Sequence, residues 1–216
     1  MVERLRLPLS CALALAGAAA CQTVPPQPPG TPRPTVVVEE AEAWRAVASP
    51  RHSAALDALA AQWDRALAAT RAAGLGRRAA SEGPLLDRSA ALPRGAPPPG
   101  SYRCRFVRLG TKRWSASAQG FCYVTVVAGQ LSLATELRGL RLGGYLWEPK
   151  AGDRLVFLGA AVPAGGKTAP AYRGDAPDDV AGVVDRIGEF RYRLALPEPG
   201  AGHDFTVVEL VAAPRT

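Results

Sequence analysis

Histidine, lysine and methionine are scarce in this chain of 216 residues. The two histidines, His52 and His203, lie far apart in sequence, and neither has a second ligand at the spacing of a zinc site. The nucleophile motif Gly-x-Ser-x-Gly is also absent, so the sequence lacks the pattern of a Ser-His-Asp hydrolase. We therefore expect no cofactor, no metal site and no catalysis by histidine.

Complete phosphate and calcium motifs are also missing. Residues 165–168 (Gly-Gly-Lys-Thr) resemble the end of a P-loop, but the first glycine of that motif is absent and Pro170 follows where a helix should begin. Asp175, Asp178 and Asp179 lack the spacing of a calcium loop. We interpret the first segment as a loop and the three carboxylates as a solvated loop or a strand cap.

The N-terminus indicates export. Arg4 and Arg6 make it positive, Leu7–Ala19 is a short apolar run, and three alanines precede Cys21. Such a run is too short to remain as a membrane-spanning helix and is typical of a signal peptide, here residues 1–21. The Ala-Ala-Ala-Cys ending resembles a bacterial lipobox and predicts lipidation of Cys21. Cleavage as an ordinary secretory signal is the alternative.

The four cysteines and the residue after Cys21 extend this prediction. The residue after Cys21 is Gln22 and not Asp, as in lipoproteins sent to the outer membrane. We therefore expect a periplasmic protein anchored in that membrane. A soluble periplasmic or secreted protein is the alternative. Cys11 leaves with the signal. Cys104 and Cys122 then remain in an oxidising compartment, where a disulfide is expected. A catalytic thiol would leave the other cysteine idle.

Proline content and charge divide the rest of the chain. Residues 22–38 are rich in proline, favour polyproline II and predict a tether. Residues 39–96 are predicted as a helical region with a proline-rich connection, and residues 97–216 as an antiparallel β domain. For an exported protein the net charge of +7 favours an anionic envelope polymer over nucleic acid as partner, although genome composition also produces an arginine bias.

One amphipathic helix is predicted between Ser49 and Gly74. Ser49 is a suitable N-cap, and Pro50 suits the first helical position. An apolar stripe then recurs at spacings of three and four: Leu56, Leu59, Trp63, Leu67 and Thr70. We expect this helix to pack on the β domain; a membrane-surface or partner helix is the alternative.

Eight short strands are expected in the second half of the chain, joined mostly by turns that contain glycine or proline. They are Tyr102–Leu109, Phe121–Ala128, Gln130–Leu137, Leu142–Trp147, Arg154–Val162, Val180–Asp185, Glu189–Leu196 and Phe205–Ala212. No helix of crossover length lies between them, so an antiparallel meander is predicted. The predicted fold class is α+β: an N-terminal amphipathic helix region packed on an antiparallel meander of about eight strands, a small lipocalin-like barrel.

A period of two assigns the strand faces. The inward set contains Tyr102, Cys104, Phe106, Phe190, Tyr192, Leu194 and Leu196. Residues 155–158 (Leu-Val-Phe-Leu) are apolar on both faces, so their strand needs cover on both sides. We expect the predicted helix to lie across it.

The outward face supplies the candidate binding residues. They are Arg103, Arg105, Arg108, Arg191 and Arg193. If their strands are neighbours, these arginines form a basic patch suited to an anionic envelope polymer; a scattered, solvated face is the alternative. Trp114, expected at the tip of an exposed 110–120 loop, is a further candidate, because this loop would be the insertion element of an inhibitor.

Five segments of the chain form a recognisable set. They are Trp44-Arg45, Glu82–Asp87, Pro97–Arg105, Arg154–Gly159 and Asp179–Gly188, and the motif Pro-Pro-Gly-x-Tyr-Arg-Cys-Arg is the most specific part. Over about residues 39–213 the chain resembles a bacterial envelope family catalogued as domain of unknown function 4893. The resemblance implies an exported protein with helices before strands, and it implies no activity.

We therefore expect a non-catalytic exported lipoprotein of the cell envelope, attached to the membrane through Cys21, that binds a small apolar ligand or a protein partner. The barrel interior separates these two options, because an open cavity favours a carrier and a filled interior favours a protein-binding module. An inhibitor of an envelope hydrolase acting through the 110–120 loop is the alternative. An uncharacterised hydrolase is disfavoured, and the oligomeric state stays open.

Overall fold

The computed structural model describes residues 43–110, 114–149, 153–162, 166–197 and 205–214. Its helices are α1 (Ala43–Val47), α2 (Pro50–Asp57), α3 (Leu59–Ala72) and α4 (Gly76–Ala80), followed by the 3-10 turns η1 (Gly83–Leu85) and η2 (Arg88–Ala90). Its strands are β1 (Gly100–Leu109), β2 (Ser115–Ala116), β3 (Gly120–Val127), β4 (Gln130–Leu137), β5 (Leu140–Trp147), β6 (Leu155–Ala161), β7 (Asp179–Gly188), β8 (Arg191–Pro197) and β9 (Phe205–Ala212).

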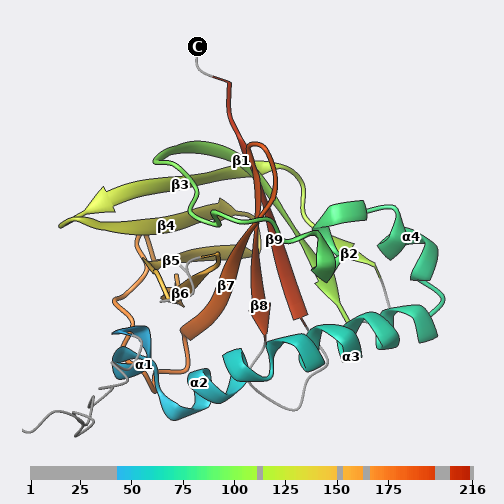
Figure 1. The fold of residues 1–216 in the computed structure, drawn as a ribbon, viewed down its shortest axis with the longest axis horizontal. Helices are drawn as coiled ribbons and strands as arrows, with labels where there is room; N and C mark the ends of the chain where they lie inside the picture. Colours follow the sequence, from blue (N-terminus) through green and yellow to red (C-terminus); the bar gives the residue numbers. More distant parts are fainter. Residues whose placement is uncertain (1–42, 111–113, 150–152, 163–165, 198–204, 215–216) are drawn as a thin grey trace, which may run out of the picture. The chain divides into compact units, whose positions relative to one another are not determined.

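Eight strands form a closed antiparallel barrel (Figure 1). From β3 to β9 each strand pairs with the next one along the chain, and β1 pairs with both β3 and β9. The closing pair runs from Tyr102 opposite Ala212 to Leu109 opposite Phe205. The two-residue strand β2, which the sequence did not predict, adds beside Val107 and Arg108 of β1. The predicted α+β class and the small barrel are confirmed.

The barrel interior is filled by side chains that alternate with outward ones, as a period of two requires. Its largest buried members include Tyr102, Phe106, Leu133, Leu137, Phe157, Tyr192, Leu194 and Leu210. The inward orientation predicted for Tyr102, Cys104 and Phe106 is therefore confirmed. The same prediction was wrong for Phe190, which is 59% exposed because it lies in the turn before β8 rather than on the strand.

A second hydrophobic layer lies outside the barrel, under the helices. Leu56, Leu59 and Trp63 share one cluster there with outward residues of β6 to β9 and β1. Helix α2 contacts β7, and α3 contacts β1, β8 and β9 (Figure 1). Strand β6 is buried on both faces, as predicted, but the helices lie mainly across its neighbours rather than across β6 itself.

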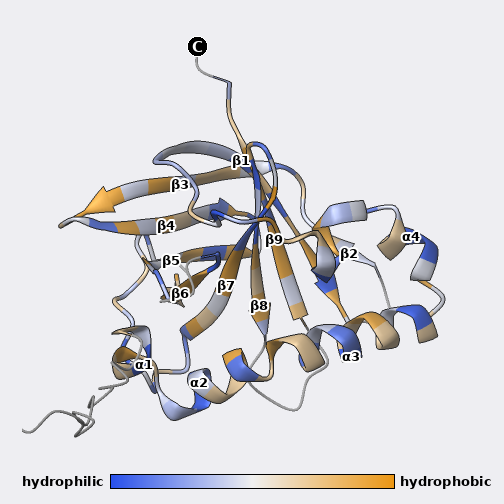
Figure 2. Ribbon diagram, viewed as in Figure 1, coloured by the Kyte–Doolittle hydropathy of each residue, from blue (hydrophilic) through white to orange (hydrophobic). Residues whose placement is uncertain are grey.

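The predicted helix is two helices, α2 and α3, which meet at Ala58. Its start is confirmed, since the Ser49 side chain accepts a hydrogen bond from the His52 N–H and Pro50 occupies the first turn. Its end is confirmed as well, because Gly74 adopts a φ of 79° and the following N–H donates to the Thr70 carbonyl. Hydrophobic and hydrophilic stretches alternate along both helices (Figure 2). None of the described helices is both long and apolar enough to cross a membrane.

Candidate functional site

Arg193, a predicted member of the outward basic patch, is completely buried. It does point away from the barrel interior, but α3 and the η1–η2 segment cover β8 at this point. Its Nε donates to Oδ2 of Asp185 at 3.0 Å, and its guanidinium lies 4.7 Å from the centre of the Trp63 ring. The prediction of a solvated Arg193 was therefore wrong, because a side chain that points outward from β8 enters the hydrophobic layer between the barrel and the helices.

The Arg193 guanidinium also binds the backbone of the η1–η2 segment. Nη1 donates to the carbonyls of Pro84 at 3.0 Å and Asp87 at 2.6 Å, and Nη2 donates to the Arg88 carbonyl at 3.1 Å. Burial lowers the pKa of Arg193, while Asp185 opposes this shift. This buried cation therefore holds the helical layer onto the barrel rather than facing a partner.

Arg105 and Arg191 are neutralised by acidic neighbours. Arg105 Nε donates to Glu209 at 2.6 Å and its Nη2 to Glu82 at 2.5 Å, and hydrogen bonding to Glu82 raises the pKa of Arg105. Arg191 Nε donates to the other oxygen of Glu209 at 2.6 Å. Strands β1 and β8 are not the direct neighbours that the patch required, because β9 lies between them and pairs with both. The carboxylates of Glu209 and Glu82 bind the central cations of the predicted patch.

Arg103 and Arg108 remain as the accessible members of the predicted patch. The Arg103 side chain is exposed on β1, opposite Phe121 of β3. Arg108 donates to the Gly139 carbonyl at 3.3 Å and lies 5.0 Å from the Phe106 ring centre. Two separate cations do not make the predicted five-arginine surface, so the basic-patch prediction was wrong.

Trp114 does not stand at the tip of an exposed loop. It is half-buried, packs against the helical core cluster and lies 5.8 Å from the Arg78 guanidinium. Residues 111–113 fall outside the described ranges, and Ser115–Ala116 form β2. These contacts count against an inhibitory loop anchored by Trp114.

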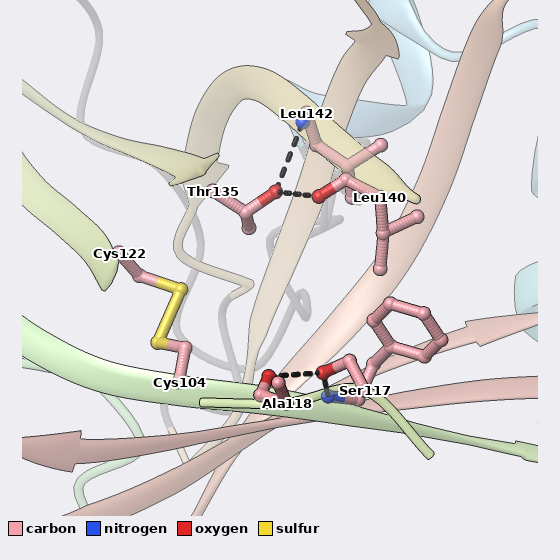
Figure 3. The surroundings of a disulfide bond; sticks show 8 residues. Cys104, Ser117, Ala118, Cys122, Thr135, Leu140 and Leu142 are labelled. Atoms are coloured by element: carbon pink, nitrogen blue, oxygen red, sulfur yellow. Dashed lines mark hydrogen bonds between the residues drawn. A yellow bond between two sulfur atoms is a disulfide. The ribbon is translucent and has the colours of Figure 1, made fainter. Parts of the chain in front are cut away.

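The predicted Cys104–Cys122 disulfide is confirmed, with Cα atoms 5.9 Å apart (Figure 3). Both cysteines are buried inside the barrel, where the bond joins β1 to β3. Near it, the Thr135 hydroxyl donates to the Leu140 carbonyl at 2.9 Å and accepts from the Leu142 N–H at 3.0 Å, closing the β4–β5 turn. The disulfide is a structural element. Cys21, the predicted lipidation site, lies outside the described residues.

A buried polar cluster that sequence reasoning missed joins α2 to the segment before β7. Tyr172 Oη accepts from the Ser49 N–H at 3.0 Å and lies 2.7 Å from His52 Nδ1. Ser49 Oγ lies 3.2 Å from the same ring nitrogen, and Arg51 Nη2 lies 3.4 Å from Nε2. Burial, and next the positive charge of Arg51, lower the pKa of His52. The ring is therefore neutral near pH 7.

The aspartates of the predicted loop act as a cap. Asp179 is buried, and its carboxylate accepts from the backbone N–H groups of Arg173 and Ala176 at 3.1 to 3.2 Å. Asp178 pairs with the Arg173 guanidinium. In the described ranges no group of three His, Cys, Asp or Glu side chains is placed to hold a metal ion.

The outward face of β3, β4 and β5 is exposed, in contrast with the covered strands β7 to β9. Three aromatic side chains stand on it: Phe121, Tyr123 and Tyr145, which are 52%, 36% and 39% exposed. In the strand register, Tyr123 lies opposite Ala134, and Ala134 lies opposite Gly143. The aromatic residues therefore border a floor of small ones.

A groove of about 590 Å³ lies over this floor. Ala134, Gly143, Tyr145 and residues 167–172 line it, and Ala169 lies against Gly143. Only glycine fits at position 143, because a Cβ there would lie 2.8 Å from the Ala169 Cβ. Arg141 fixes the wall, since it donates to the carbonyls of Gly166 and Lys167 at 3.0 Å each. The groove is thus formed before any ligand arrives.

Comparison with known proteins identifies a family but no function. A family model described as domain of unknown function (DUF4893) matches residues 44–210, from α1 to β9. No curated protein and no solved structure matches the chain.

Proposed function

Since the chain belongs to the DUF4893 family, to which no activity is assigned, we propose from its own features that it is a non-catalytic exported lipoprotein of the bacterial cell envelope that binds its partner on the outside of its barrel. One observation carries the proposal. The barrel interior is filled by buried side chains, whereas aromatic residues and a groove are exposed on its outer surface.

The filled interior counts against a carrier of a small apolar ligand. A carrier of lipocalin type keeps its ligand inside the barrel. Here Tyr102, Phe157 and Tyr192 occupy that space, and Tyr102 meets Tyr192 edge to face with ring centres 6.1 Å apart. Because side chains occupy the interior, we expect the partner to bind on the outside of the barrel.

The N-terminal sequence supports the location. A signal-like segment ends at Cys21, and a proline-rich stretch follows it. A lipid anchor followed by a polyproline tether of about 3.1 Å per residue would hold the barrel away from the membrane, with its outer face accessible.

The test uses the full chain in its host. A photo-cross-linking amino acid replaces Thr125, which is exposed on β3, or Arg65, which is exposed on α3 as the control. We expect a cross-linked adduct from Thr125 and none from Arg65, and lipid labelling that disappears in Cys21→Ser. Equal adducts from both positions would contradict binding through the outer barrel face, and labelling of Cys21→Ser would contradict the anchor.

A further inference from the structure

The groove over β4 and β5 has the chemistry of a sugar-binding surface, and we infer that it binds a linear glycan of amino sugars that carry carboxylates, as in the glycan strands of peptidoglycan. This inference rests on the proposed function, because it names the partner of the same outer face.

The shape suits a flat ring. Tyr145 lines the groove on β5, and the exposed Ala134 lines it on the neighbouring strand β4. Tyr123 lies opposite Ala134 on β3, at the margin of the groove. A sugar ring presents an apolar C–H face, which packs on an aromatic ring or a small-residue floor. A protein interface instead usually centres on large buried anchors. Small residues at the centre and aromatic ones at the margin favour the sugar.

The polar groups suit the edge of such a ring. The hydroxyls of Thr125 and Ser132 lie 2.8 Å apart on the same outer face, in the same row across the strands as Tyr145, and Ser132 lines the groove. Each hydroxyl both donates and accepts, as the hydroxyls and amides of an amino sugar do. A ligand rich in such groups can exchange hydrogen bonds with this pair.

The charge of the groove favours a ligand that carries few negative charges along its length. Lys167, Arg141 and Glu136 line it, which leaves an excess of one positive charge. The Arg141 guanidinium already donates to two carbonyls of the wall, so Lys167 is the cation best placed for a ligand. One carboxylate on alternate sugars matches this charge. A nucleic acid, with one phosphate per nucleotide, requires a basic channel along the whole strand.

The test is calorimetric titration of the detergent-solubilised full chain. The probes are a peptide-free tetrasaccharide of peptidoglycan, an N-acetylglucosamine tetramer without the lactyl carboxylate, and an oligothymidylate. We expect both glycans to bind, the carboxylated one more tightly. Tyr145→Ala should raise the Kd of both glycans about tenfold through one lost aromatic contact. The control Phe190→Ala, which removes a more exposed aromatic on the β7–β8 turn, should leave the Kd unchanged.

Lys167→Ala provides the second variant, and thermal unfolding confirms that each variant keeps its fold. We expect this change to remove the preference for the carboxylated glycan and to leave the neutral tetramer unaffected. Absence of glycan binding, unchanged binding by Tyr145→Ala, or preferential binding of the oligothymidylate would overturn the inference. If glycans fail while Thr125 still cross-links to an envelope protein, only the ligand class is wrong. If both fail, the proposed function falls too.

Discussion

The buried pair of Asp185 and Arg193 provides the sharpest test of how the helical layer is held on the barrel. Both side chains are fully buried, and the Arg193 guanidinium donates to four carbonyls of the η1–η2 segment as well as to Asp185. Asp185→Asn keeps the shape of the side chain and removes its charge. Arg193 would then be a buried cation without its closest counter-charge.

The expected cost follows from that geometry. Removing one partner of a buried ion pair destabilises a protein by about 3–5 kcal/mol, because the remaining charge stays out of water. Arg154 also bonds Asp185, at 2.6 Å, but its side chain is 43% exposed. Arg154→Gln should therefore cost no more than about 1 kcal/mol, since its charge interacts mainly through solvent.

Urea unfolding followed by tryptophan fluorescence measures both variants, and Trp63, one of the four tryptophans, lies under the Arg193 guanidinium. A third variant, Asp185→Leu with Arg193→Met, removes both charges and leaves the η1–η2 carbonyls without their donors. It should remain destabilised, because each buried carbonyl left unpaired costs about 1–3 kcal/mol. If Asp185→Asn lies within 1 kcal/mol of wild type by this measurement, the reasoning about the buried pair is wrong.

Three further outcomes are expected. Replacing Cys104 and Cys122 by Ala opens a crosslink between residues 18 apart and should lower the free energy of unfolding by about 3 kcal/mol in urea; an unchanged midpoint would contradict this. Burial lowers the pKa of His52 from 6.5, so the unfolded chain takes up the proton at a higher pH than the folded chain does. The stability that the neutral ring contributes above pH 6.5 should therefore be lost as pH falls through the folded pKa. Between pH 7 and pH 5 the melting temperature of wild type should fall more than that of His52→Gln, as checked by thermal unfolding. Burial raises the pKa of Tyr102 to about 12, and its hydroxyl donates to the Pro98 carbonyl at 2.6 Å; alkaline absorbance titration should show a late-ionising tyrosine that is missing in Tyr102→Phe, and an identical titration of the two proteins would count against it.

Local chemistry explains the predictions that were confirmed. The N-cap at Ser49 and the stop at Gly74 depend on hydrogen bonds within a few residues, so they are visible in the sequence. The inward positions of Tyr102, Cys104 and Phe106 follow from alternation along one strand, and the disulfide follows from two cysteines on paired strands.

Distant partners explain what the sequence did not reveal. His52 and Tyr172 lie 120 residues apart, and neither carries a local signal for the other. The aromatic groove also depends on register, because Ala134 and Gly143 become neighbours only when β4 pairs with β5. No spacing within one strand indicates such a surface.

The sequence by itself determined the order of helices and strands, the alternation of each strand and the crosslink, because these depend on short-range periodicity and on residue type. Only the tertiary structure decided which outward-pointing side chains are exposed to solvent. Arg103 and Arg193 occupy equivalent alternating positions, yet one is exposed and the other buried, because the second layer covers β8 and leaves the start of β1 free. Whether a strand face is covered depends on helices that are distant in sequence, so the alternation of residues within one strand does not predict it.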